Sequence, residues 1–139
     1  MKVTWLAAGS VVIAILMLTA CSSLPNQVSV DESSSGKQVN VVVNGTITVT
    51  LDSNATTGYS WEIKDIQEAS GQMILQKIDN KYVAPTGGAI GAGGKEVWTF
   101  KALTAGTSTL TMDYSQPWAG GQKGARIFTL TVVSKYATK

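Results

Sequence analysis

Apolar and polar residues alternate along much of this chain, and this pattern restricts the backbone more than any other feature of the sequence. Successive side chains of a β-strand point to opposite faces, so a period of two predicts strands with one buried face. The alternation starts at Gln38 and returns in short runs as far as Ser134. No segment has the 3.6-residue period of an amphipathic helix, although residues 65–72 have room for one short turn. The chain is therefore predicted to be all-β.

The runs predict about seven to eight short strands. A strand is expected from about Met73 to Ile78, with an extension through Tyr82-Val83, and Asn44-Gly45 has the composition of a hairpin turn. Short strands separated by turn residues are typical of an immunoglobulin-like β-sandwich. The apolar positions of the other runs are Val39, Val41 and Val43; Ile47, Val49 and Leu51; Tyr59, Trp61 and Ile63; Trp98, Phe100 and Ala102; Leu110, Met112 and Tyr114; Phe128, Leu130 and Val132.

The first 20 residues have the features of an export signal. Lys2 precedes an uncharged apolar stretch that is slightly shorter than the about 20 residues that span a membrane. Leu18-Thr19-Ala20-Cys21 follows, and this quartet resembles the lipobox of bacterial lipoproteins, in which the cysteine is acylated. We therefore expect a lipoprotein signal peptide over residues 1–20 and lipidation at Cys21. The alternative is an ordinary cleavage site that leaves a free thiol.

Residues 21–37 are polar and rich in serine, which predicts a flexible, lipidated tether in front of an immunoglobulin-like domain over residues 38–135. Two acyl chains or more would hold the protein on a membrane, since each buried methylene contributes roughly 0.8 kcal/mol. Ser22 follows the cysteine, where aspartate would favour retention in the inner membrane of a Gram-negative cell. The expected location is the cell envelope, and in a Gram-negative cell the outer membrane.

Composition excludes several classes of function. Lys2 is the only one of the 11 basic residues within residues 1–20, so the remainder keeps 10 against 9 acidic residues, which argues against nucleic acid as a partner. The sequence has no histidine and one cysteine, so Ser-His-Asp and Cys-His catalysis are absent. The acidic residues are scattered singly and form no spaced pair for acid–base work or for calcium. We expect no enzymatic activity, no cofactor and no metal, and a monomeric domain.

Long connections are expected at one end of the sandwich. If consecutive strands run up and down, every second connection shares an end, which groups residues 53–58, 79–94 and 115–124. The connections at the other end, around Asn44-Gly45 and Thr104-Ala105-Gly106, are short. Natural domains usually keep long loops for binding, so the first group is the candidate binding surface.

These three connections carry motifs that resemble those of the chagasin family, proteinaceous inhibitors of papain-family cysteine peptidases. That family has an Asn-Pro-Thr-Thr-Gly loop, a Gly-x-Gly-Gly loop and an Arg-Pro-Trp loop, in this order. The corresponding segments here are Asn54-Ala55-Thr56-Thr57-Gly58, Gly91-Ala92-Gly93-Gly94 and Gln116-Pro117-Trp118. Each motif alone is weak evidence, because turns, flexible glycine loops and core-edge aromatic residues have similar compositions. Their joint occurrence, in order and after an export signal, is specific.

The resemblance implies a reversible, non-covalent inhibitor that occludes the peptidase cleft with residues 53–58, 86–94 and 115–121. It implies that the loop around Thr57 lies nearest the catalytic cysteine and that Trp118 packs beside the cleft. The implied peptidase-binding residues are Asn54, Ala55, Thr56, Thr57, Gly58, Tyr59, Gly91, Gly93, Gly94, Gln116, Pro117 and Trp118.

The sequence departs from the family pattern at two positions. Ala55 replaces a proline, which lowers the expected preorganisation of its loop, and Gln116 replaces an arginine, which removes a charged donor. The competing interpretation is an adhesive or structural immunoglobulin-like envelope lipoprotein that binds protein or glycan. Neither the target peptidase nor its origin, own or host, follows from the sequence.

Overall fold

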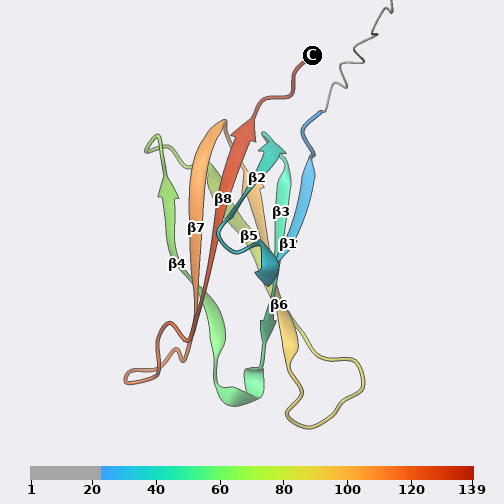
Figure 1. Ribbon diagram of the computed structural model, residues 1–139, viewed down its shortest axis with the longest axis vertical. Helices are drawn as coiled ribbons and strands as arrows, with labels where there is room; N and C mark the ends of the chain where they lie inside the picture. The colour runs from blue at the N-terminus through green and yellow to red at the C-terminus, as the bar shows by residue number, and fades with distance from the viewer. Residues whose placement is uncertain (1–22) are drawn as a thin grey trace, which may run out of the picture.

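Two four-stranded β-sheets face each other in the computed structural model, which describes residues 23–139 (Figure 1). The predicted signal peptide and Cys21 lie outside the described residues. One sheet has the strand order β1-β3-β6-β5 and the other β2-β8-β7-β4. The first sheet contains β1 (Gln27–Asp31), β3 (Thr46–Ser53), β6 (Gly94–Ala102) and β5 (Leu75–Val83). The second contains β2 (Lys37–Val42), β8 (Arg126–Lys135), β7 (Gly106–Ser115) and β4 (Ser60–Glu68).

The core lies between the two sheets and confirms the predicted β-sandwich. Alternate residues of β3, β6, β7 and β8 are buried, as the period of two requires. Phe100 and Phe128 are the largest fully buried side chains, and Trp61 is 3% exposed. Residues 23–139 contain only short 3₁₀ turns besides strands, and the burial of apolar side chains between the two sheets is the main favourable contribution to folding. No helix within residues 23–139 is long and apolar enough to cross a membrane.

The tether expected over residues 21–37 is wrong for residues 27–37. Residues 27–31 form β1, which pairs in parallel with β3 along its whole length, and Val30 is buried against the core. A 3₁₀ turn, η1 (Glu32–Ser34), then leads into β2. The domain therefore begins at Gln27 rather than Gln38, because even a short and mostly polar segment satisfies the free edge of β3.

The hairpin predicted at Asn44-Gly45 is also wrong. β2 pairs with β8 and β3 pairs with β1 and β6, so the two strands that flank this turn belong to different sheets. Asn44 has the left-handed conformation that the turn signal implies, with φ of 68°. A turn therefore occurs at Asn44-Gly45, but it connects β2 in one sheet to β3 in the other.

Three long loops extend from the same end of the sandwich, as predicted (Figure 1). We call them the first loop (residues 54–59, between β3 and β4), the second loop (residues 84–93, between β5 and β6) and the third loop (residues 116–125, between β7 and β8). β5 continues through Val83, so the second loop starts later than residue 79. The chain enters β1 at the opposite end, near the C-terminus (Figure 1).

Candidate functional site

The first loop is held in shape by the side chain of Asn54. Residues Ala55–Thr57 form one 3₁₀ turn, η2, and the Oδ1 atom of Asn54 accepts hydrogen bonds from the Thr56 amide (3.1 Å) and the Thr56 hydroxyl (2.6 Å). The Thr57 hydroxyl donates to the Asn54 carbonyl over 2.7 Å. A side-chain oxygen that caps the first free amides stabilises a helical turn. This cap provides order at the loop where proline is absent at position 55.

Asn54 also ties the first loop to its surroundings. Its backbone amide donates to the Tyr114 hydroxyl over 2.8 Å, and its Nδ2 atom donates to the Gly91 carbonyl of the second loop over 3.0 Å. Both polar atoms of the Asn54 side chain are thus bonded inside the domain. The sequence predicted Asn54 as a contact residue, and its bonds in the structure position the loop.

Gly58 and Trp118 bring the first and third loops into contact. Gly58 ends η2 in the left-handed conformation, with φ of 76°. A Cβ atom placed on Gly58 would lie 2.5 Å from Cη2 of Trp118, so the indole lies directly against the glycine backbone. Trp118 remains 50% exposed, which leaves a large rigid face for a partner. The sequence motifs of two loops therefore form one surface.

The glycines of the predicted Gly91-Ala92-Gly93-Gly94 motif have two different roles. Gly91 has φ of 84° and is exposed, whereas Gly94 is buried as the first residue of β6. A Cβ atom on Gly94 would lie 2.5 Å from the Tyr82 hydroxyl and closer still to the Val83 carbonyl. Gly94, predicted as a contact, thus serves the packing of β5 on β6. Ile90, at the far end of the second loop, is fully exposed and was not among the predicted contacts. The sequence signal is a single large apolar residue in a glycine-rich loop that has no alternating pattern.

Gln116 is partly buried in the third loop, whereas Pro117 is exposed. The Gln116 amide donates to the Gln122 carbonyl over 2.8 Å, and its Oε1 atom accepts from the Gln122 amide over 3.0 Å. These two bonds close the loop on itself. The Lys123 ammonium donates to the Gln116 carbonyl over 2.5 Å. Pro117 is exposed beside Trp118. Gln116 therefore stabilises the loop where arginine stands in the family pattern.

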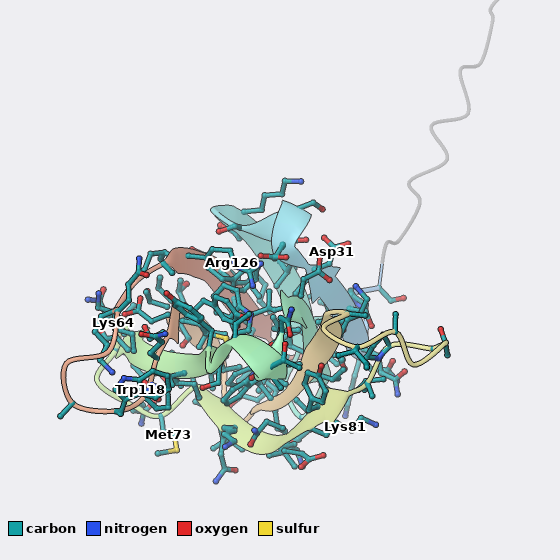
Figure 2. All side chains as sticks on the ribbon, turned by 90° about the horizontal axis from the view of Figure 1, so that it is seen from below. Asp31, Lys64, Met73, Lys81, Trp118 and Arg126 are labelled. Atoms are coloured by element: carbon teal, nitrogen blue, oxygen red, sulfur yellow. The ribbon has the colours of Figure 1, made fainter. Side chains whose placement is uncertain are left out.

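An aromatic and cationic cluster supports the roots of the first and third loops. The rings of Tyr59 and Tyr114 stack with centroids 5.3 Å apart, and the Tyr59 hydroxyl donates to the Gln122 side chain. The Arg126 guanidinium lies 4.1 Å from the Tyr114 centroid and 5.1 Å from that of Trp61. Cations over aromatic faces stabilise such clusters when partly desolvated. Figure 2, a view from the loop end, separates Arg126 from Trp118, so the cluster and the exposed indole are distinct features.

Arg126 also fastens the N-terminal segment to the root of the first loop. Its guanidinium pairs with the Glu32 carboxylate at 2.7 Å and donates to the Asp52 carbonyl over 2.5 Å. Arg126 is the first residue of β8, and nothing in its sequence position indicated that it would contact three separate segments. Long-range contacts of this kind depend on which strands the fold brings together.

Glu96 is the third residue, after Ile90 and Arg126, that the sequence patterns did not identify. It is 8% exposed, and its Oε1 atom accepts hydrogen bonds from the Ser53 hydroxyl (2.6 Å) and the Trp61 amide (3.0 Å). The signal was present, because Glu96 occupies the apolar phase of the run that continues through Trp98, Phe100 and Ala102. A charged side chain on the buried face of a strand needs hydrogen-bond partners to offset its desolvation.

A pocket of about 620 Å³ opens between the roots of the first and second loops. Asn54, Pro85 and Gly93 are among the residues that line it, and Tyr114 and Arg126 contribute as well. Asp52 and Lys95 also line the pocket, and the Lys95 ammonium lies 2.6 Å from the Asp52 carboxylate. The hydrogen bond to Asp52 raises the pKa of Lys95 above its ordinary value, so the Lys95 ammonium stays protonated at neutral pH. No cluster of three or more His, Cys, Asp or Glu side chains that could hold a metal ion occurs in the part of the chain described by the structure.

Comparisons with known proteins identify the family to which the chain belongs. Residues 40–132 match the family model described as chagasin family peptidase inhibitor I42. Chagasin from Trypanosoma cruzi is 30% identical over 101 residues, which cover 73% of this chain and 92% of chagasin. The crystal structure of the cysteine protease inhibitor EhICP2 from Entamoeba histolytica has a TM-score of 0.63 at 23% identity, with 78% of this chain and 95% of that chain covered.

A second solved structure has the same fold in the presence of a peptidase. PbICP-C in complex with falcipain-2 has a TM-score of 0.52 at 17% identity, with 82% of this chain and 93% of that chain covered. At these identities the two structures support the fold, while the sequence matches define the family. The chain belongs to the chagasin family of peptidase inhibitors.

Proposed function

We propose that residues 27–135 form a reversible, non-covalent inhibitor of papain-family cysteine peptidases that fills the active-site cleft with its three loops. The observation that carries this proposal is the convergence of the three loops at one end, with the first loop bonded to the second and packed against the third. The complex of PbICP-C with falcipain-2 supports a cysteine peptidase as partner. A protein of this family acts as an inhibitor and not as an enzyme.

The shape of the first loop explains how a peptidase would be blocked without cleaving the inhibitor. Peptide hydrolysis requires an extended segment in the cleft, with a carbonyl presented to the thiolate. Residues Ala55–Thr57 instead form a closed 3₁₀ turn whose backbone is bonded to Asn54 and Gly58. The small side chains of Thr56 and Thr57 are exposed at the tip, so a narrow cleft can admit them. Such a loop offers no bond in register for attack.

Trp118 and Ile90 are suited to the two walls of the cleft. They lie on the third and second loops, and both expose large apolar surface. Tryptophan is over-represented among residues whose truncation costs at least about 2 kcal/mol of binding energy. Because the loops are braced before binding, less conformational entropy is lost on association.

A titration of papain with the soluble domain, residues 22–139, tests the proposal. We expect reversible, active-site-directed inhibition, with the inhibitor still intact on a denaturing gel after prolonged incubation. Competition by a small substrate-like inhibitor is the control for the site of action. A normal rate of papain and of a cathepsin at micromolar domain would contradict the proposal and favour an adhesive envelope protein.

We further propose that the domain is anchored to a membrane through acylated Cys21 after removal of residues 1–20. The chain enters β1 at the end opposite the three loops (Figure 1), an arrangement that would hold the loops away from a lipid surface. Residues 22–26 lie between this cysteine and β1 in the sequence, and the carbonyls of Pro25 and Asn26 already accept hydrogen bonds from the domain, so the tether would be only a few residues long. An outer-membrane location in a Gram-negative cell is consistent with Ser22 after the cysteine.

A Cys21→Ser substitution tests the anchor. We expect the full-length protein to fractionate with membranes and the variant to lose this association, because the acyl chains supply roughly 0.8 kcal/mol per buried methylene. The measurement is the partition of each protein between membrane and soluble fractions, with mass spectrometry of the N-terminal peptide. An unmodified Cys21 in the purified wild-type protein would contradict the proposal.

A further inference from the structure

The Glu96 carboxylate joins the two strands from which the first loop extends. Ser53 is the last residue of β3 and Trp61 is the second residue of β4, so they flank the loop on either side. One oxygen of Glu96 accepts from the Ser53 hydroxyl over 2.6 Å and from the Trp61 amide over 3.0 Å. These two bonds hold the two ends of the first loop together, although Glu96 itself lies on β6 and not in that loop.

The two strands that flank this loop do not pair with each other. β3 pairs with β1 and β6, whereas β4 pairs with β7 in the opposite sheet. A loop between two sheets lacks the hydrogen bonds that would fix its ends in a hairpin. One further bond across its base joins the Trp61 indole to the Asp52 carbonyl over 3.0 Å. The Glu96 carboxylate thus joins β3 and β4, which share no backbone hydrogen-bond ladder.

Glu96 is buried, so its carboxylate depends on the hydrogen bonds from Ser53 and Trp61. Glu96 lies between Leu51 and Tyr82 in the sheet, on the face that buries Trp98 and Phe100. Placing a carboxylate there carries a desolvation cost, which the two hydrogen bonds offset. Leucine at this position would leave the Trp61 amide and the Ser53 hydroxyl without this acceptor.

We infer that Glu96 is a positioning residue for peptidase binding, which holds the first loop in its inhibitory conformation by fixing both of its ends. The inference rests on the proposed function of the loops. Glu96 also lies two residues after Gly94, where the second loop joins β6. Any peptidase that binds the first loop depends on this carboxylate without touching it.

The test compares Glu96→Leu with Glu96→Gln in the otherwise unchanged protein. Leucine removes both acceptors, and glutamine keeps a carbonyl oxygen in the same place. We expect Glu96→Leu to raise the inhibition constant for papain by at least about tenfold, since hydrogen bonds to charged groups are lost. We expect Glu96→Gln to stay within about threefold of the wild type, because the acceptor is retained. Equal impairment of both variants would overturn the acceptor role.

Amide hydrogen exchange in the free protein supplies a readout that a general loss of stability would not produce. In Glu96→Leu the Trp61 amide and the amides of residues 55–58 are expected to exchange about tenfold faster, with those of β7 and β8 unchanged. Uniform acceleration through both sheets, or no acceleration in the first loop, would overturn the inference. Ser53→Ala removes one of the two bonds and gives a milder version of the same test if the leucine variant does not fold.

These two readouts separate the inference from the proposed function. If the wild type does not inhibit papain or a cathepsin, the inhibitory function is wrong, and exchange in the first loop still decides whether Glu96 fixes its ends. If the wild type inhibits and Glu96→Leu inhibits equally, the function stands and the positioning role is wrong.

Discussion

Replacement of Gly58 by valine is expected to weaken inhibition of papain by at least about 100-fold. Two effects act at this position. The residue has φ of 76°, a conformation that β-branched side chains strongly disfavour, and a Cβ atom would lie 2.5 Å from Cη2 and 2.9 Å from Cζ3 of Trp118. Valine therefore disrupts the end of η2 and displaces the indole, which affects the first and third loops together. The inhibition constant and the circular dichroism spectrum are the measurements.

Gly71→Val is the matched control for this substitution. Gly71 has φ of 71°, close to that of Gly58, but it lies in the turn between β4 and β5 at the opposite end, and no atom would come within 4 Å of a Cβ placed on it. We expect it to lower the free energy of unfolding by about 1–2 kcal/mol and to leave inhibition unchanged. Equal inhibition by the Gly58→Val and Gly71→Val variants would show that contact between the first and third loops does not matter for binding.

A Thr57→Arg substitution is expected to reduce inhibition by a comparable factor, at least about 100-fold, while the midpoint of thermal unfolding stays nearly constant. Thr57 is exposed at the tip of the first loop, and its hydroxyl makes one local bond to the Asn54 carbonyl. Arginine adds a long charged side chain where the loop is proposed to enter a narrow cleft. That single local hydrogen bond is all that the fold is expected to lose.

Ser70→Arg serves as the control because Ser70 is exposed in the turn at the other end of the sandwich. It adds the same charge and volume, so a general effect of net charge on papain would appear in both variants. We expect inhibition by Ser70→Arg to equal that of the wild type. Loss of folding in Thr57→Arg, or full inhibition by it, would place the peptidase contact elsewhere.

Sequence patterns predicted most strands because alternation is a local property. The buried residues of β3, β6, β7 and β8 follow the expected phase, and the three long loops lie between the predicted strands. β1 was missed because Gln27–Asp31 is short and polar except for Val28 and Val30, so it resembles the serine-rich residues around it. Its stability comes from the free edge of β3, which no local pattern reveals.

The candidate site shows the same division between local and long-range information. The motifs identified Thr56, Thr57 and Trp118, which are exposed on the loops. The same motifs contain Asn54 and Gly94, whose contacts in the structure are internal to the domain. A motif does not by itself separate residues that support a loop from residues that face a partner, because both kinds of residue depend on the same loop conformation.

Sequence alone determined that this chain forms short strands with one buried face, joined by three long loops with chagasin-like motifs, because strand periodicity and turn composition are encoded by neighbouring residues. Tertiary structure decided which strands pair, that the N-terminal segment completes a sheet, and that Glu96 and Arg126 hold the base of the first loop. These contacts join residues that are far apart in the chain, by 35 positions for Glu96 with Trp61 and by 94 for Arg126 with Glu32. Only the packing of the two sheets brings such residues within hydrogen-bonding distance.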